Sequence, residues 1–354
     1  MTDIRFLPYE RAHEIAADEL IVCDCYYHRG LNLTHLYSER VPPPYRANTS
    51  TETGLNWLAD KRSNKPGATA HYVTCNHWDI DGMLSVWSVL NPDLALANRE
   101  LLVAAAHLGD FREFDHRSAL SLDALKLCCI LNRVEADEFC LPFGDLNDAT
   151  MEFEVSAQKF EYFLPRFADW LRDLDAFEPL WRPEYDDVMR DIAAIEAGEV
   201  AIDEIAAPAI SVVKTNRPLH YYAIFSHVRG GAVLTEISEP HYIEFEYRYE
   251  TAVGRNDKTV MERCDLSDVA TALNRNESAP GVRWVFDNIN EGGSMLRPEY
   301  SNKPLSREDR YQSLGYRLKN GLAPSTTIDA SAVLKLIVQE YEKQKERTPS
   351  VYAP

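Results

Sequence analysis

Three metal-type side chains, His77, Asp79 and Asp81, stand at alternate positions between an apolar β-like run and an apolar helix-like run. In an extended segment, alternate side chains point to the same side, so we expect the imidazole and the two carboxylates to converge. Gly82 follows them and permits a tight turn into the helix, whose N-terminus favours a bound anion. The segment therefore predicts a metal site for chemistry on a phosphate or a carboxylate.

The same segment also has a purely structural interpretation. An aspartate before a helix is an ordinary N-cap, and Asp-x-Asp-Gly is an ordinary turn sequence. An EF-hand loop fits poorly, because Ser88 would occupy the twelfth position, where a bidentate glutamate belongs. We favour the metal site, because a helix cap needs only one such side chain, whereas this segment has a histidine and two carboxylates at alternate positions.

The segment resembles the first motif of the DHH phosphoesterase superfamily, in which a strand leads into His-x-Asp-x-Asp-Gly and a serine follows in the helix. The matching residues are His77, Asp79, Asp81, Gly82 and Ser85. The resemblance implies a metal-dependent phosphoesterase, and we assign Ser85 to substrate binding. The longer block Asn-His-x-Asp-x-Asp-Gly-x-Leu-Ser-Val-Trp, with a downstream Gly-Asp-Phe, is also similar to an uncharacterised bacterial family.

Further candidate residues follow a second apolar run, 101–106, which we predict to be a strand. The carboxyl ends of strands carry the site in open α/β sheets, so His107, Asp110, Asp115 and His116 are expected beside the first cluster. Asp110 best matches the lone aspartate of the superfamily's second motif. Asp115-His-Arg is the nearest sequence to the third motif, Asp-His-His, but it lacks the second histidine. Asp115 also fits an N-cap, and the number of metals, one or two, stays open.

The expected chemistry is hydrolysis of a phosphate ester or another small anionic molecule, with Mn²⁺ or Mg²⁺ as the metal. His77, Asp79, Asp81, Asp110 and Asp115 are the expected metal ligands. His107 and His116 are assigned the proton transfers, because an unperturbed imidazole titrates near neutrality. Arg297 and Arg229 are assigned to the substrate anion, because a guanidinium pairs with phosphate in a bidentate manner.

Three other functions fit part of the pattern. Asp79 and Asp81 also match the Asp-x-Asp-Gly start of haloacid-dehalogenase-type phosphatases, although polar residues precede Asp79 where those enzymes have apolar ones. A His/Asp cluster also serves non-phosphate chemistry in small-molecule biosynthesis, with iron for oxidative steps. A binding protein with a degenerate site is the third alternative, because a fold resemblance does not define a function.

The composition limits the partners. Asp and Glu outnumber Lys and Arg by 56 to 37, which gives a formal charge of −19. A surface this acidic repels polyanions. We therefore expect a small-molecule substrate and no long nucleic acid. No apolar run reaches transmembrane length, no signal peptide is visible, and the seven cysteines lack disulfide-framework spacing. These features predict a cytoplasmic protein with reduced thiols and no membrane partner, and leave a homodimer open.

The order of elements predicts two α/β-type domains. In domain 1–198, a strand over 20–27, a capped helix from 50 and a strand over 71–75 alternate as in a mostly parallel sheet flanked by helices. Asp24, in the first of these strands, fits either a carboxylate behind the metal ligands or an ordinary strand-edge residue.

The second predicted domain, 209–342, is a smaller α+β domain on an antiparallel sheet, covered on one face. Its strands are predicted over 209–214, 221–225, 232–237 and 241–250, the last with alternating charged residues on the uncovered face, and its last helix over 330–342. Residues 198–208 are predicted as a linker, and the tail 343–354 as disordered. The site is expected in a cleft between the two domains.

Overall fold

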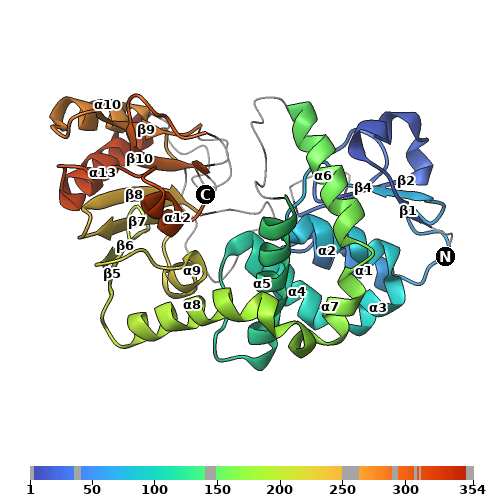
Figure 1. Ribbon diagram of the computed structural model, residues 1–354. Coiled ribbons are helices and arrows are strands. Elements are labelled where there is room, and N and C mark those ends of the chain that lie inside the picture. Colours follow the sequence, from blue (N-terminus) through green and yellow to red (C-terminus); the bar gives the residue numbers. More distant parts are fainter. Residues whose placement is uncertain are drawn as a thin grey trace. The chain divides into compact units, whose positions relative to one another are not determined.

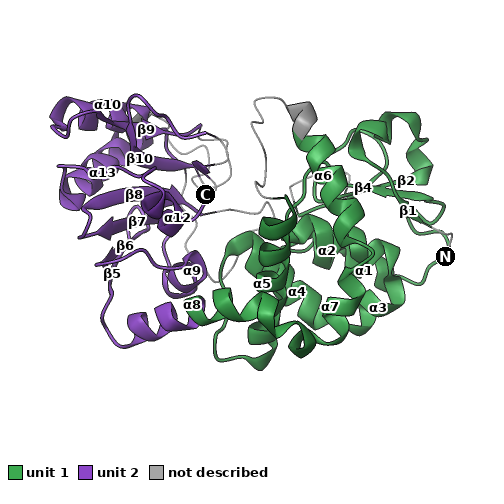
Figure 2. Ribbon diagram, in the orientation of Figure 1, with its two compact units in different colours: residues 1–187, 250–255 green, residues 188–249, 256–354 purple. Residues whose placement is uncertain are grey.

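The computed structural model describes residues 4–35, 41–139, 149–248, 263–288, 294–306, 309–310 and 312–347 (Figure 1). The chain divides into two compact units, coloured separately in Figure 2. Unit 1 lies in the N-terminal half and ends at Asp187, and unit 2 begins at Val188. The division falls inside α8 (Glu178–Glu196), a little before the predicted end at residue 198. No helix in the described ranges is long and apolar enough to cross a membrane.

Unit 1 is built on a four-stranded sheet in which all neighbours are parallel. In spatial order the strands are β1 (Arg5–Phe6), β4 (Tyr72–Thr74), β2 (Leu20–Cys23) and β3 (Leu31–Leu33). Every residue of β2 and β3 is buried, as expected for a parallel sheet covered on both faces. The predicted parallel α/β architecture of the N-terminal domain is therefore confirmed.

Helices form most of the rest of unit 1 (Figure 1). α1 packs against α2, α2 against α4, and α4 against α5. Thr49 accepts a hydrogen bond from the Glu52 N–H, so the predicted capping residue does begin α1. The helices are α1 (Ser50–Ala59), α2 (Ile80–Leu90), α3 (Pro92–Ala97), α4 (Arg99–Phe111), α5 (Ala119–Phe139), α6 (Ala149–Phe163) and α7 (Phe167–Arg172), with short 3-10 turns at Tyr9–Glu14, Ala17–Glu19, Pro43–Tyr45 and Leu174–Phe177.

The predicted strand over 101–106 is wrong, because this segment lies inside α4. Leu102, Ala105, Ala106 and Leu108 are its buried residues, and their spacing of three and four is that of a helix face. A short apolar run fits a buried strand and a buried helix equally well, and the three consecutive alanines favour the helix. Asp110 therefore stands on the last turn of a helix rather than after a strand.

Unit 2 contains a six-stranded mixed sheet, so the α/β two-domain fold class is confirmed. Residues 221–225, predicted as a strand, form α9 (Tyr221–His227), which makes β6 and β7 a parallel pair. The other neighbours are antiparallel. In spatial order the strands are β5 (Ala201–Ile205), β6 (Ile210–Thr215), β7 (Ala232–Ile237), β8 (Tyr242–Tyr247), β10 (Met295–Tyr300) and β9 (Val282–Phe286). β5 lies within the predicted linker.

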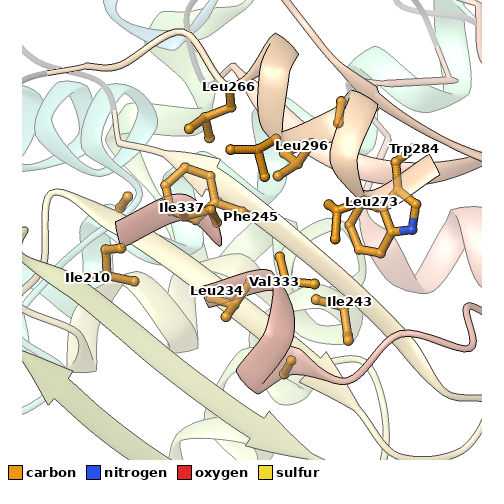
Figure 3. Close-up of a cluster of buried hydrophobic side chains, with 14 of the residues drawn as sticks. Ile210, Leu234, Ile243, Phe245, Leu266, Leu273, Trp284, Leu296, Val333 and Ile337 are labelled. Atoms are coloured by element: carbon orange, nitrogen blue, oxygen red, sulfur yellow. The ribbon is translucent and has the colours of Figure 1, made fainter. Parts of the chain in front are cut away.

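α10 (Ser267–Asn276) and α13 (Ala330–Arg347) cover one face of this sheet. Figure 3 shows Phe245 and Leu234 of the strands meeting Ile337 and Val333 of α13. The predicted last helix and residues 343–347 of the predicted tail therefore form one long helix, α13.

The opposite face of β8 was predicted to be open to solvent because of its alternating charged residues, and this is wrong. Tyr242 and Glu244 are buried, and Arg317 of α12 (Leu314–Lys319) donates to Glu244 at 2.8 Å. The alternation therefore marks a buried, paired charge layer rather than a solvated face.

Candidate metal centre

Candidate ligands follow the carboxyl ends of three neighbouring parallel strands in unit 1. Asp24 follows β2, His35 lies two residues beyond β3, and His77 lies in the loop after β4. Because these strands are parallel neighbours, their carboxyl ends meet at one edge of the sheet. Helix ends add three carboxylates to this edge. We call the six side chains the ligand cluster: Asp24, His35, His77, Asp79, Asp81 and Asp110.

One half of the cluster surrounds the Nδ1 atom of His35. This nitrogen lies 3.4 Å from Asp24 Oδ1, 3.2 Å from Asp81 Oδ2 and 3.7 Å from Asp110 Oδ2. Atoms bound to one cation at about 2.1 Å stand about 3.0 to 3.4 Å apart, so the Asp24 and Asp81 distances fit a shared metal ion, and Asp110 stands slightly farther away. We call this half the inner position, because the side chains of His35 and Asp110 are each 11% exposed and that of Asp81 is fully buried.

The other half surrounds the Nε2 atom of His77. It lies 3.3 Å from Asp24 Oδ2 and 3.2 Å from Asp79 Oδ2. The Nδ1 atom of the same ring lies 2.7 Å from Asn76 Oδ1, a contact that orients the ring with Nε2 toward the carboxylates. We call this half the outer position, because the His77 and Asp79 side chains are 36% and 45% exposed.

Asp24 belongs to both positions. Its Oδ1 atom faces His35 and its Oδ2 atom faces His77, and the side chain is 2% exposed. Ser50 Oγ donates to Oδ1 at 2.6 Å and fixes the carboxylate. The backbone of Asp24 has φ of +50°, a left-handed conformation that aspartate and asparagine adopt more readily than most residues other than glycine. A buried carboxylate that turns one oxygen to each of two histidines has the arrangement of a ligand that bridges two metal ions.

Two helix N-termini fix the aspartates of the first motif. Asp79 is the N-cap of α2: its Oδ1 accepts the Gly82 N–H at 2.7 Å while Oδ2 faces His77. The capping and the ligand interpretations of Asp79 are therefore compatible. Asp81 lies inside the first turn of α2, so the predicted extended geometry is wrong for it. Its carboxylate accepts the N–H groups of Ser50 and Thr51, at the start of α1, at 2.7 and 2.8 Å.

The pKa values of the two imidazoles are raised by the four carboxylates around them. Burial lowers the pKa of His35, but the hydrogen bond to Asp81 and the nearby carboxylate charges outweigh it and raise the pKa to about 10. The pKa of His77 is likewise raised well above its usual value, because Asp79 and Asp24 outweigh burial. Both histidines therefore carry a proton at neutral pH when no cation is present.

The pKa of each carboxylate depends on its burial and on the charges around it. Burial, followed by the charges of Asp79 and Asp81, raises the pKa of Asp24 to about 6. Burial also raises the pKa of Asp110 well above its usual value. Burial acts in the same direction on Asp79, but the charge of His77 outweighs it, so the pKa of Asp79 is lowered. Ionised oxygens are thus disfavoured at the buried end of the cluster, where a cation would reverse the effect.

The structure brings four predicted ligands together, His77, Asp79, Asp81 and Asp110, and adds Asp24 and His35. Asp115 does not join them. It is exposed, and its carboxylate accepts the Arg117 N–H at 3.0 Å in the turn before α5. Ser118 Oγ accepts the Ser121 N–H at the start of α5, so Asp115 is a turn residue and not the cap of this helix. His116 stands beside it in the same turn.

The other predicted site residues have local structural contacts. His107 lies one turn before Asp110 on α4, and its ring lies 4.6 Å from that of Phe111. Ser85 is buried in α2 and donates to Gly82 O at 2.8 Å.

The two predicted arginines belong to unit 2. Arg297 is 1% exposed, and its terminal nitrogens donate to Asp287 and Glu299, so its guanidinium already pairs with two carboxylates. Arg229 is exposed in the loop after α9, where its backbone N–H donates to Glu204. Their roles, and the cleft between the domains, stay predictions.

Gly82 lies close to two carboxylates of the cluster. A Cβ atom there would lie 3.1 Å from Asp79 Oδ1 and 3.2 Å from Asp24 Oδ2. We therefore expect Gly82→Ala to weaken metal binding at least tenfold, while the helix propensity of alanine offsets most of the strain, leaving unfolding free energy within about 1 kcal/mol.

Gly54→Ala in α1 is the matched control for this substitution. Its nearest atom is Ser85 O, at 4.0 Å from the added Cβ, so the alanine meets no crowded oxygen. We expect it to stabilise the protein by about 0.5–1 kcal/mol and to leave metal affinity unchanged. Isothermal titration and urea unfolding check both variants. Equal metal affinity in Gly82→Ala and wild type would contradict the close approach of the ligands.

The fold and the cluster together define an α/β protein of two units with a candidate two-position metal centre in the first. A family model described as a family of unknown function (DUF6687) matches residues 2–350, so the chain belongs to this family. No curated protein and no solved structure matches the chain. The function therefore has to be argued from the cluster itself.

Proposed function

We propose that the protein is a metal-dependent hydrolase that acts on a small phosphorylated or otherwise anionic molecule, with the ligand cluster holding two divalent cations. The observation that carries the proposal is the position of Asp24, whose two oxygens face the two histidines. The resemblance of the segment around His77 to the DHH phosphoesterase motif supports the same class of reaction.

The residues of the cluster differ in burial, and therefore in their proposed roles. Asp24, His35 and Asp81 are buried and held by α1, so they keep the inner position rigid. His77 and Asp79 are the exposed ligands, so the substrate approaches from their side. Bound divalent cations polarise a phosphoryl oxygen and provide a nucleophile from water at neutral pH.

The ligand atoms and the composition indicate the cofactor and the compartment. Carboxylate oxygens with one imidazole at each position suit Mn²⁺ or Mg²⁺, and Fe²⁺ is compatible with the same atoms. The six cysteines in the described residues are free thiols, which supports a reducing compartment such as the cytoplasm. The net charge of −19 favours a small substrate over a long nucleic acid.

Hydrolysis of generic phosphate esters by protein loaded with Mn²⁺, with Zn²⁺ or with both tests the proposal. We expect turnover of a phosphodiester or phosphomonoester probe by the wild type, and a loss of at least about 100-fold in Asp79→Asn. Asparagine is as good an N-cap as aspartate, so circular dichroism of the variant should match the wild type. Asp93→Asn, an exposed aspartate in the first turn of α3, is the control and should keep full activity.

Two outcomes would contradict the proposal. Wild-type protein that binds metal but hydrolyses none of the probes would remove the phosphoesterase reaction and leave a metal centre for other chemistry. Activity in Asp79→Asn equal to that of Asp93→Asn would remove Asp79 from the site.

A further inference from the structure

A buried thiol lies at the outer position. Cys75 directly follows β4, two residues before His77, and is 2% exposed. Cys75, His77 and Asp24 each offer one ligand atom, and these atoms all lie within 4.8 Å of one another. The thiol is therefore one of a group of three different donor types, imidazole, carboxylate and sulfur, at the same place.

Distances from Gly82 indicate where the Cys75 sulfur lies. A Cβ atom built there would lie 3.2 Å from Asp24 Oδ2 and 3.3 Å from Cys75 Sγ, so both atoms face the same small space. The Asp24 oxygen concerned is the one that faces His77 and not the one that faces His35. The sulfur also lies 4.0 Å from His77 Nδ1, so it stands beside the His77 ring, in the outer half of the cluster.

The inner position has a different donor set. The group that contains His35 consists of one imidazole and carboxylates, Asp24 and Asp81 being within 4.8 Å, and Asp110 lies near the same nitrogen. Oxygen-rich sites favour hard cations such as Mg²⁺ and Mn²⁺, whereas a thiolate favours the borderline-soft Zn²⁺. The two halves therefore differ in the metal that they should prefer.

We propose that Cys75 is a thiolate ligand of the outer position, which makes this position selective for Zn²⁺ while the inner position takes Mn²⁺ or Mg²⁺. The inference rests on the proposed two-position centre and adds the identity of the outer metal. In the described structure the thiol donates to His77 O at 3.0 Å. Zinc binding breaks the S–H bond, releases its proton to the buffer and forms a sulfur–zinc bond, with no electron transferred.

Co²⁺ is the probe, because a cobalt–thiolate bond gives a near-ultraviolet charge-transfer absorption that oxygen and nitrogen ligands do not give. We expect this absorption in Co²⁺-loaded wild type and its loss in Cys75→Ser. Cys128→Ser is the matched control, since Cys128 is an equally buried thiol in α5 that is absent from the ligand groups of the described residues. It should keep the absorption.

Affinity provides a second readout that does not depend on activity. Cys75→Ser should weaken Zn²⁺ binding at least tenfold and change Mn²⁺ binding at the inner position by less than twofold. Two equivalents of Co²⁺ without the absorption in wild type would overturn the thiolate assignment alone, even if the variant does not fold. No metal bound by wild type would overturn the proposed function as well.

Discussion

Asp24→Asn is expected to abolish binding at both metal positions, with a loss of affinity of at least about 100-fold at each. The reason is that the two carboxylate oxygens serve different histidines, and an amide offers one weaker oxygen and no charge. Asparagine has the shape of aspartate, accepts the Ser50 hydroxyl equally well and tolerates the left-handed backbone, so the fold should persist. Isothermal titration with Mn²⁺ and Zn²⁺ checks the result.

The same substitution should stabilise the metal-free protein at high pH. Burial and the charges of Asp79 and Asp81 raise the pKa of Asp24 to about 6, above the value of about 3.9 in an unfolded chain. A raised carboxyl pKa means that no stability is lost below the unfolded value and that stability falls as pH rises through the folded value. At pH 8 the ionised carboxylate should cost on the order of 2–3 kcal/mol, which asparagine removes.

Urea unfolding in the presence of a chelator, at pH 4 and pH 8, measures this effect. Asp24→Asn should match the wild type at pH 4 and exceed it at pH 8, whereas Asp18→Asn, an exposed aspartate before the same strand, should change stability by less than about 0.5 kcal/mol. A lower stability of Asp24→Asn at pH 8 would mean that the ionised carboxylate is stabilised without a cation.

Metal affinity is expected to rise steeply with pH. The pKa of His35 is raised to about 10 and that of His77 is also raised, so a cation at either position must displace an imidazole proton. Below the folded pKa, each displaced proton makes the affinity about tenfold higher per pH unit, or about 1,000-fold from pH 6 to pH 9 at the inner position. In the metal-free protein the same proton stabilises the fold fully below the unfolded pKa of about 6.5, and this is lost as pH rises through about 10.

Competition with a chelator at several pH values gives the slope, and titration in buffers of different ionisation enthalpy counts the protons released. His35→Asn should reduce the number of protons released at the inner position by one and leave that of the outer position unchanged, because Asn carries no proton to displace. Affinity that does not change between pH 6 and pH 9 in the wild type would show that the histidines are neutral or do not bind the metal.

The sequence predicted the outer half of the centre better than the inner half. His77, Asp79 and the helix that follows are local neighbours, so their spacing carries most of the information. The inner half depends on which strands pair. Asp24 was weighed as a carboxylate behind the ligands or as a strand-edge residue, and His35 was not proposed as a ligand, because neither has a motif around it. Both become candidate ligands once β2, β3 and β4 are parallel neighbours.

Single-sequence periodicity also failed where a run was short. Residues 101–106 and 221–225 are apolar stretches that suit strand and helix alike, and both proved to be helical. The alternation in β8 predicted the strand but not its surroundings, because Arg317 pairs with Glu244 from 73 residues away. Asp110 was placed correctly beside the cluster although the predicted strand before it was wrong.

The metal content of purified protein tests the two-position centre most directly. Protein grown with manganese, iron and zinc available, then dialysed, should contain about two metal equivalents per chain by elemental analysis, and Asp24→Asn should contain almost none. A wild-type protein with no metal would contradict the account, since the six side chains would then be a buried polar network. A full equivalent retained by Asp24→Asn would contradict the bridging role of this residue.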